Sequence, residues 1–210
     1  MSSYILTAPL WMEKEGARIA RGLRKRDSEL LDRLIELYQH RLLRYLYFLT
    51  GRKELAEDIF QETWMRVLER GHQYNGKSRF DTWLFAIARH LVIDNSRKKT
   101  GVSLEAMTEP DDGRTPMEFA CQRTSPYEDV SKAQIAGQLN TVLMQLEPVQ
   151  REVVMLRFQE ELSLDEIADV TNAPLSTVKS RLYRGLEALK PALGDLMDFE
   201  LASTSRGGKK

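Results

Sequence analysis

Apolar residues recur at intervals of three and four residues along almost every patterned segment of this chain. This is the spacing of an α-helix with one buried face, and it limits the fold more strictly than any other feature of the sequence. From Asp27 to Thr50 leucine and tyrosine residues follow the pattern, and Gly51 is a typical helix stop. Since no segment shows the alternating pattern of a strand, the sequence predicts an all-α fold.

Two interruptions divide the predicted helices. A helix from about Glu54 to Arg70 is followed by the loop GHQYNGKS, and the next helix reaches about Arg97. Thr100 to Thr124 then loses the helical period and is acidic and rich in turn residues, which indicates a flexible linker. Helices resume with a cap at Ser125. The prediction is two small helical domains, with an N-terminal extension (1–22), a first domain (23–99), a flexible acidic linker (100–124), a second domain (125–194) and a disordered tail (195–210).

The formal net charge is zero, yet the charges are segregated along the chain. Six bases face two acids between Tyr74 and Lys99, and four bases face one acid between Leu175 and Lys190. Glu54 to Glu69 holds five acids and one base. Thr100 to Glu147, between the two basic stretches, holds eight acids and three bases. Two basic stretches separated by an acidic one indicate two contacts with one polyanion, together with surfaces for another partner.

Composition argues against several classes of protein. The single cysteine, Cys121, excludes an internal disulfide framework and a cysteine-based zinc site. No apolar run reaches the ~18–20 residues of a membrane-spanning helix, and the start of the chain lacks the features of a signal peptide. The histidines His40, His72 and His90 do not have metal-ligand spacing, and no phosphate loop or nucleophile elbow is present. We therefore expect a cytoplasmic protein without cofactor, metal or catalytic residues.

The segment LSLDEIADVTNAPLSTVKSRLYRGLEALK carries the most specific pattern in the chain. A short helix from Leu164 to Val170 is followed by the turn TNAP and by a longer helix to about Lys190. Ala168, Asn172 and Val178 supply the small crossing residue, the turn residue and the apolar anchor of a helix-turn-helix. The pattern predicts binding to duplex DNA.

The second helix of this motif has a polar face opposite its apolar stripe. Arginine can bond two guanine acceptors in the major groove, and the other side chains can reach base edges or phosphates. A bundle helix with an ordinary solvated basic face is the alternative interpretation. The candidate DNA-binding residues are Ser176, Thr177, Lys179, Ser180, Arg181, Tyr183 and Arg184.

The first basic stretch mixes rings with positive charge, which suits single-stranded DNA. Unpaired bases stack on flat side chains while lysine and arginine follow the backbone. Trp83 falls on the buried stripe and is better explained as core, Phe80 fits either role, and His90 alone could be a surface histidine. The candidate residues are Tyr74, Asn75, Gly76, Lys77, Ser78, Arg79, Phe80, Arg89, His90, Asn95, Arg97 and Lys98.

Between these features, the helix AEDIFQETWMRVL would present an acidic outer face that includes a methionine. Such a face can dock on a basic protein partner, although composition alone favours an ordinary solvated helix. The residues of this face are Asp58, Gln61, Glu62 and Met65.

Taken together, these segments resemble the extracytoplasmic-function group of bacterial RNA polymerase sigma factors. AEDIFQETWMRVLE is similar to region 2.2, FDTWLFAIARHLVIDNSRKK to regions 2.3 and 2.4, and LEPVQREVVMLRFQEELSLDEIADVTNAPLSTVKSRLYRG to region 4. The resemblance implies that the acidic face docks on the polymerase β′ clamp and that the second domain touches the β flap. It also implies that the loop after Tyr74 holds a flipped base of the −10 element, that region 4 reads the −35 element, and that an anti-sigma factor is a partner. Many members of the family have asparagine at the position of His90.

Two other functions fit parts of the sequence. A helix-turn-helix regulator acting without polymerase docking explains the second domain but not the ring-bearing loop. An enzyme with a nucleic-acid-binding tail lacks any catalytic motif.

The linker sets an expectation for the free protein. A coil of about 25 residues spans roughly 25–30 Å on average, whereas the two promoter elements of this family lie on the order of 70 Å apart. We therefore expect a compact free protein, with its domains in contact and at least one DNA-binding face partly covered.

Overall fold

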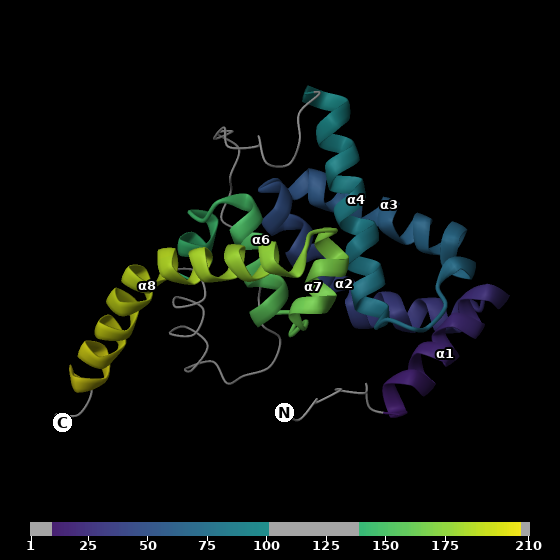
Figure 1. The fold of residues 1–210 in the computed structure, drawn as a ribbon, viewed down its shortest axis with the longest axis horizontal. Coiled ribbons are helices and arrows are strands. Elements are labelled where there is room, and N and C mark those ends of the chain that lie inside the picture. Colours follow the sequence, from purple (N-terminus) through teal and green to yellow (C-terminus); the bar gives the residue numbers. More distant parts are fainter. Residues whose placement is uncertain (1–9, 101–138, 207–210) are drawn as a thin grey trace.

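The computed structural model describes residues 10–100 and 139–206, and these ranges contain helices and turns but no strand. Every regular element of the described residues is a helix (Figure 1), which confirms the predicted all-α fold class. The predicted linker beyond residue 100 and the cap at Ser125 lie outside the described residues. The elements are α1 (Leu10–Lys25), α2 (Ser28–Thr50), α3 (Lys53–Arg70), the 3₁₀ turn η1 (Gly71–Gln73), α4 (Phe80–Thr100), α6 (Pro148–Phe158), α7 (Leu164–Thr171) and α8 (Leu175–Arg206).

Local chemistry explains where these helices begin and end. The side chain of Asp27 accepts a hydrogen bond from the backbone N–H of Leu30 at 3.1 Å, which caps α2. Gly51 ends the same helix in the left-handed conformation, with φ of 67°, as its sequence position predicts. Pro148 occupies the first turn of α6, where its missing N–H has no helical partner to lose.

Helices α1 to α4 and η1 form the N-terminal unit, whose core includes the fully buried Leu42, Val67 and Leu84. Helix α1 belongs to this core, because Ile19 and Leu23 on its apolar stripe are buried there. The predicted boundary between an extension ending at residue 22 and a first domain therefore falls inside a continuous helix. An amphipathic helix cannot be divided there without exposing its buried stripe.

Helices α6 to α8 form the C-terminal unit around buried Leu156, Ile167 and Val178. Helix α8 continues to Arg206 with Pro191 inside it, so the described helix includes residues 195–206 of the segment predicted to be a disordered tail. The segment ALGDLMDFELA, which follows the proline, is rich in strong helix formers, and this favours continuation of the helix.

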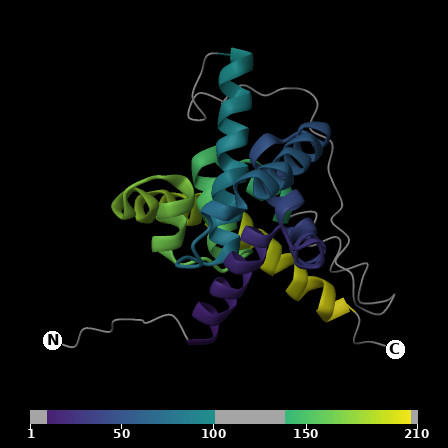
Figure 2. The same ribbon diagram turned by 90° about the vertical axis from the view of Figure 1, so that its right-hand side faces the viewer.

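The two units pack against each other, with α4 along α7 and α2 against α6. Figures 1 and 2 both show the C-terminal end of α4 projecting away from the other described helices. The contact between the units confirms the expectation of a compact free chain. It also places part of the basic stretch between Tyr74 and Lys99 inside an interface.

Candidate nucleic-acid interface

The turn between α7 and α8 has the local geometry of a helix-turn-helix. Ser163 accepts a hydrogen bond from the backbone N–H of Glu166, whose carboxylate accepts from the N–H of Ser163, forming a capping box. Asn172 ends α7 in the left-handed conformation, with φ of 48°, Ala168 packs on the core, and Val178 is fully buried. All three predicted motif residues therefore have their predicted structural roles.

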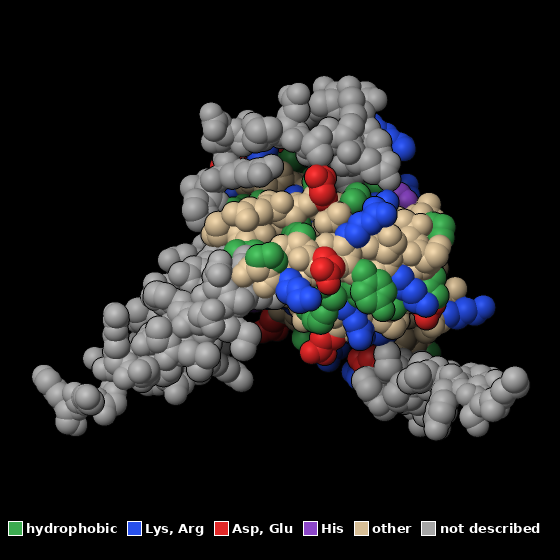
Figure 3. Space-filling view, turned by 60° about the vertical axis from the view of Figure 1, so that its left-hand side comes forward, with side chains coloured by type: hydrophobic (Ala, Val, Ile, Leu, Met, Phe, Trp, Pro, Cys, Tyr) green, Lys and Arg blue, Asp and Glu red, His purple; other side chains and the backbone are tan. Residues whose placement is uncertain are grey.

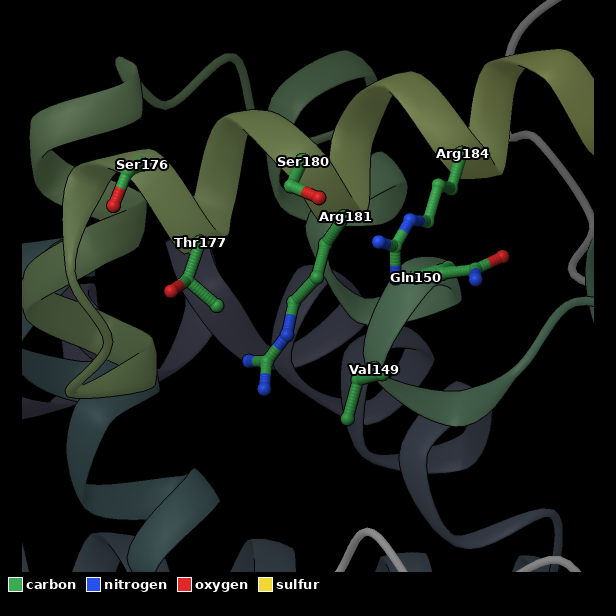
Figure 4. Close-up of a pocket in the computed structure, with 7 residues that line it drawn as sticks. All are labelled: Val149, Gln150, Ser176, Thr177, Ser180, Arg181 and Arg184. Atoms are coloured by element: carbon green, nitrogen blue, oxygen red, sulfur yellow. The ribbon is translucent and has the colours of Figure 1, made fainter.

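The outer face of α8 is open to solvent in this structure. Lys179 and Arg184 are exposed, and the ring of Tyr183 is 68% exposed. Figure 4 shows the side chains of Arg181 and Arg184 extending from α8 toward the start of α6. All seven residues predicted from sequence lie exposed or half-exposed on this helix, namely Ser176, Thr177, Lys179, Ser180, Arg181, Tyr183 and Arg184.

The first turn of α6 completes a groove along this face. Val149 and Gln150 line it together with residues of α8 (Figure 4). Sequence reasoning missed both residues, because their place beside α8 follows from helix packing and not from any local pattern. A groove lined by amide, hydroxyl and guanidinium groups can form hydrogen bonds with phosphates and base edges.

The loop from Tyr74 to Arg79 is held by its own hydrogen bonds. The hydroxyl of Tyr74 donates to the carbonyl of Ser78 at 2.7 Å, and the side chain of Asn75 accepts from the N–H of Lys77 at 2.9 Å. Gly76 has φ of 75°, which favours glycine. Asn75 and Lys77 are exposed, so the loop presents an amide and an ammonium group to solvent.

The rings that flank this loop do not face solvent. Tyr74 is 2% exposed and Phe80 is 4% exposed, and their ring centroids lie 5.6 Å apart. Trp83 packs 5.2 Å from Tyr74, and Tyr38 packs 5.4 Å from Phe80. Both rings are therefore buried in this conformation, since clustering the rings removes a large apolar area from water. Their assignment to the −10 element stays a prediction.

Helix α4 divides its predicted DNA-binding residues between solvent and the interface. His90 is exposed, with Nδ1 2.8 Å from the carbonyl oxygen of Ala86, and Arg97 is also exposed. Asn95 is half-buried. Arg89 is only 9% exposed, so its side chain is buried in this conformation, and its assignment as a DNA contact stays a prediction. Lys98 lies in α4, but its side chain is outside the described residues.

Two buried carboxylates of the C-terminal unit bond arginines of the N-terminal unit, and one of them bonds Arg89. Glu152 accepts hydrogen bonds from Arg89 Nε at 2.8 Å and from the Tyr45 hydroxyl at 2.9 Å. Glu160 accepts from Arg41 Nε at 2.6 Å and from Arg44 Nη2 at 2.8 Å. The carboxylates therefore connect the two units through charge-assisted hydrogen bonds.

Arg79 is also engaged at the junction. Its guanidinium bonds the buried carboxylate of Asp81 through Nη2 at 2.5 Å, and its Nε lies 3.7 Å from Glu166 of α7. Sequence reasoning did not identify the carboxylates at this junction. Glu152 follows the polar residues Gln150 and Arg151, so no local pattern sets it apart from an ordinary solvated residue.

The proton affinities of the junction follow from its burial. Burial raises the pKa of Tyr45 well above its usual value, and the charge of Glu152 raises it further. Burial, with the charge of Asp81, raises the pKa of Tyr38 to about 12. Burial alone lowers the pKa of Arg41, but Glu160 outweighs that effect and the net pKa is raised. Both tyrosines therefore remain neutral near neutral pH.

Figure 3 shows the electrostatic consequence on one face of the molecule. Lysine and arginine side chains there lie among acidic and hydrophobic ones and do not form an uninterrupted basic patch. Arg41, Arg79 and Arg89 form ion pairs with carboxylates of the same chain. Part of the positive charge counted in the sequence is therefore neutralised within the molecule.

The predicted acidic face of α3 is exposed as expected. Asp58, Gln61 and Glu62 face solvent, and Met65 is 54% exposed. Glu62 accepts a hydrogen bond from Arg66 Nε at 2.9 Å, so part of its charge is compensated. Leu68, one turn after Met65, is 43% exposed and extends the apolar part of this face. Its helical spacing from Met65 is a signal that could have identified it from the sequence.

Two other features, a membrane-spanning helix and a metal-binding group, are absent from the described parts of the chain. No helix there is long and apolar enough to cross a membrane. Likewise, residues 10–100 and 139–206 contain no group of histidine, cysteine, aspartate and glutamate side chains that could hold a metal ion.

Comparisons with known proteins agree with these features. The family model for Sigma-70 region 2 matches residues 34–101, and that for Sigma-70 region 4 matches residues 136–189. The chain is 31% identical to the ECF RNA polymerase sigma factor SigW of Bacillus subtilis, over 83% of this chain and 94% of that protein. It is 30% identical to SigX of the same organism, over 87% and 95%.

Solved structures show the same fold. The sigma factor RpoE from Bartonella quintana, in complex with the anti-sigma factor NepR, matches with a TM-score of 0.60 and 21% identity. The match covers 78% of this chain and 96% of that one. CnrH, in complex with the cytosolic domain of CnrY, matches with a TM-score of 0.56 and 16% identity, over 87% and 97%.

The region 2 match contains α3, the loop and α4, and the region 4 match contains the helix-turn-helix. An independent helix-turn-helix regulator is not favoured, because such a protein does not account for the region 2 match. The chain therefore belongs to the extracytoplasmic-function group of RNA polymerase sigma factors, the subunits that direct the polymerase to promoters for transcription initiation.

Proposed function

We propose that the described conformation is a closed form of the sigma factor, in which one DNA-reading surface is open and the other is partly covered. The outer face of α8 is exposed, and we assign it to the −35 element. Helix α4 and the loop from Tyr74 to Arg79 are assigned to the −10 element. Arg89 carries this proposal, because its side chain faces the C-terminal unit and bonds buried Glu152.

Opening is the step that frees α4 in this proposal. The polymerase would hold the two units apart. Because it would bind only the open form, its binding would shift the equilibrium from the closed form to the open form. A buried ion pair contributes little net stability, because desolvation offsets most of the attraction. Glu152 Oε2 is also buried without a hydrogen-bond partner among the described residues. Such a junction is suited to reversible separation.

The acidic face of α3 is assigned to the polymerase β′ clamp, and the C-terminal unit to the β flap. The solved sigma factors with the same fold were determined in complex with anti-sigma factors or a cytosolic domain. We propose an anti-sigma factor as a partner of this chain too. The protein would act in the cytoplasm, without a cofactor or catalytic chemistry of its own.

Run-off transcription with core polymerase on a library of genomic fragments tests this function. We expect a defined set of transcripts only when both the chain and core polymerase are present. Their upstream sequences should share two elements. Sequence-specific binding to these fragments by the chain alone, with no dependence on core polymerase, would support the regulator alternative instead.

Loss of Arg184 should change −35 recognition at one position. Its exposed guanidinium lies opposite the buried stripe of α8, which suits a base contact. Arg184→Ala is expected to cost roughly 1–3 kcal/mol, mostly at a single −35 base pair. Binding of holoenzyme to all single-base −35 variants measures this. Lys179→Ala is the control and should weaken binding evenly; an even loss for Arg184→Ala contradicts the base assignment.

The loop from Tyr74 to Arg79 should matter at strand opening. Asn75→Ala with Lys77→Ala removes its exposed amide and ammonium groups, which are placed to hold an unpaired base. We expect open-complex formation to fall on duplex promoters, with less loss on promoters premelted by mismatches at −10. Equal loss on both templates would assign the loop to holding the strand after melting. Full activity on both would remove the loop from the proposal.

A further inference from the structure

The backbone of α1 touches the backbone of the loop that follows Tyr74, and two glycines form the contact. A Cβ atom added to Gly16 would lie 2.6 Å from the carbonyl oxygen of Gly76. A Cβ atom added to Gly76 would lie 2.7 Å from the carbonyl carbon and oxygen of Gly16. Neither position accepts a side chain without movement of backbone, so this approach depends on glycine at both places.

The loop has two further restraints on its own side of this contact. Gly76 has a positive φ, and the hydrogen bonds of Tyr74 with Ser78 and of Asn75 with Lys77 close the turn around it. Tyr74 itself is anchored among the buried rings. The loop is therefore held by the ring cluster on one side and by α1 on the other, while Asn75 and Lys77 remain exposed.

Helix α1 is anchored well enough to act as a support. Ile19, Ala20 and Leu23 are buried in the core of the N-terminal unit. Leu23 also packs against the 3₁₀ turn that leads into the loop, because a Cβ atom at Gly71 would lie 3.1 Å from Leu23 Cβ. A helix fixed through these residues can restrict the position of the backbone that it touches at Gly16.

We propose that α1 is a positioning element for the −10 loop, with Gly16 as its contact residue. The inference rests on the proposed role of that loop in holding an unpaired base. It assigns to α1 a role in promoter opening, since exposed groups that hold a flipped base must be placed closely. In this arrangement Gly16 contacts the loop backbone and does not itself contact DNA.

Gly16→Ala tests the contact directly. Alanine is a better helix former than glycine, so α1 itself is not weakened by the change. The added methyl group can only be accommodated if the loop or α1 moves. Arg18→Lys is the matched control, because Arg18 is an exposed residue of the same helix and the charge is kept.

Hydrogen exchange of the full chain measures loop position independently of DNA. We expect amides 75–79 to exchange at least about fivefold faster in Gly16→Ala, with unchanged protection in α2 and α3. With holoenzyme on a duplex promoter found by the run-off screen, we expect open-complex formation to fall about tenfold. The control variant should match the wild type in both measurements.

Unchanged exchange in the loop of Gly16→Ala overturns the inference. Faster exchange with normal promoter opening also overturns it, provided that the Asn75→Ala, Lys77→Ala variant does lose opening. If that double variant opens promoters normally as well, the loop has no role at −10 and the proposed function of the loop fails first. Gly16→Ala could also lose promoter opening while its amides exchange faster throughout the N-terminal unit. That result would show that the whole unit is destabilised and not that the loop is displaced, and it too counts against the inference.

Discussion

A chain carrying Asp58→Arg and Met65→Ala is expected to lose association with core polymerase while keeping its fold. Both side chains are exposed on one face of α3, so neither change disturbs the core. Reversing the charge of Asp58 opposes a basic partner surface, and truncating Met65 removes an exposed apolar contact from the same face. Together the changes should cost several kcal/mol, on the order of a hundredfold or more in affinity.

Co-purification with core polymerase is the measurement, and circular dichroism reports whether the fold is kept. Asp32→Arg with Leu37→Ala is a matched control, because it makes the same two kinds of change on exposed residues of α2. The control should retain polymerase at wild-type levels. Wild-type recovery of polymerase by the folded α3 variant would contradict the docking assignment.

Replacing Glu152 and Glu160 by alanine is expected to separate the two units of the free protein. Each carboxylate is 1% exposed, and each bonds two side chains of the N-terminal unit. Removing Glu152 leaves buried Arg89 without its carboxylate, at a cost of about 3–5 kcal/mol. Removing Glu160 also takes away the carboxylate shared by Arg41 and Arg44. In the open form water solvates these arginines, so the two substitutions destabilise the closed form relative to the open form.

Small-angle scattering of the free chain should show a larger radius of gyration and maximum dimension for this variant. Its helix content should be unchanged, because both carboxylates lie at the junction and not within the core of either unit. Glu147→Ala with Glu187→Ala is the control, since both residues are exposed and the change in charge is equal. A variant as compact as the wild type would refute the closed-form proposal at its central contact.

The same variant should bind core polymerase more tightly than the wild type. If only the open form binds core polymerase, the apparent affinity of the chain is the affinity of the open form multiplied by the fraction of molecules that are open. Removing the junction carboxylates raises that fraction. Titration of core polymerase with each chain measures the difference, and the Glu147→Ala, Glu187→Ala control should not differ from the wild type.

The sequence by itself determined most of the helices, apart from α1 and the C-terminal end of α8, together with the helix-turn-helix and the exposed acidic face. These depend on spacing over a few turns: an apolar stripe, a capping residue, and a left-handed turn residue such as Asn172. The exposure of Met65 was also predictable, because the opposite side of α3 carries the apolar residues that pack on α2 and α4. Local chemistry is enough where the interacting groups are close along the chain.

Only the tertiary structure decided what the polar faces meet. Periodicity shows which side of a helix is polar, but it does not show whether that side contacts water, DNA or another carboxylate. Arg89 and Glu152 are 63 positions apart, and Arg41 and Glu160 are 119 apart, so no local pattern joins them. The contact of Gly16 with Gly76 is equally non-local. Burial of a charge depends on packing between units, and packing is a property of the assembled chain.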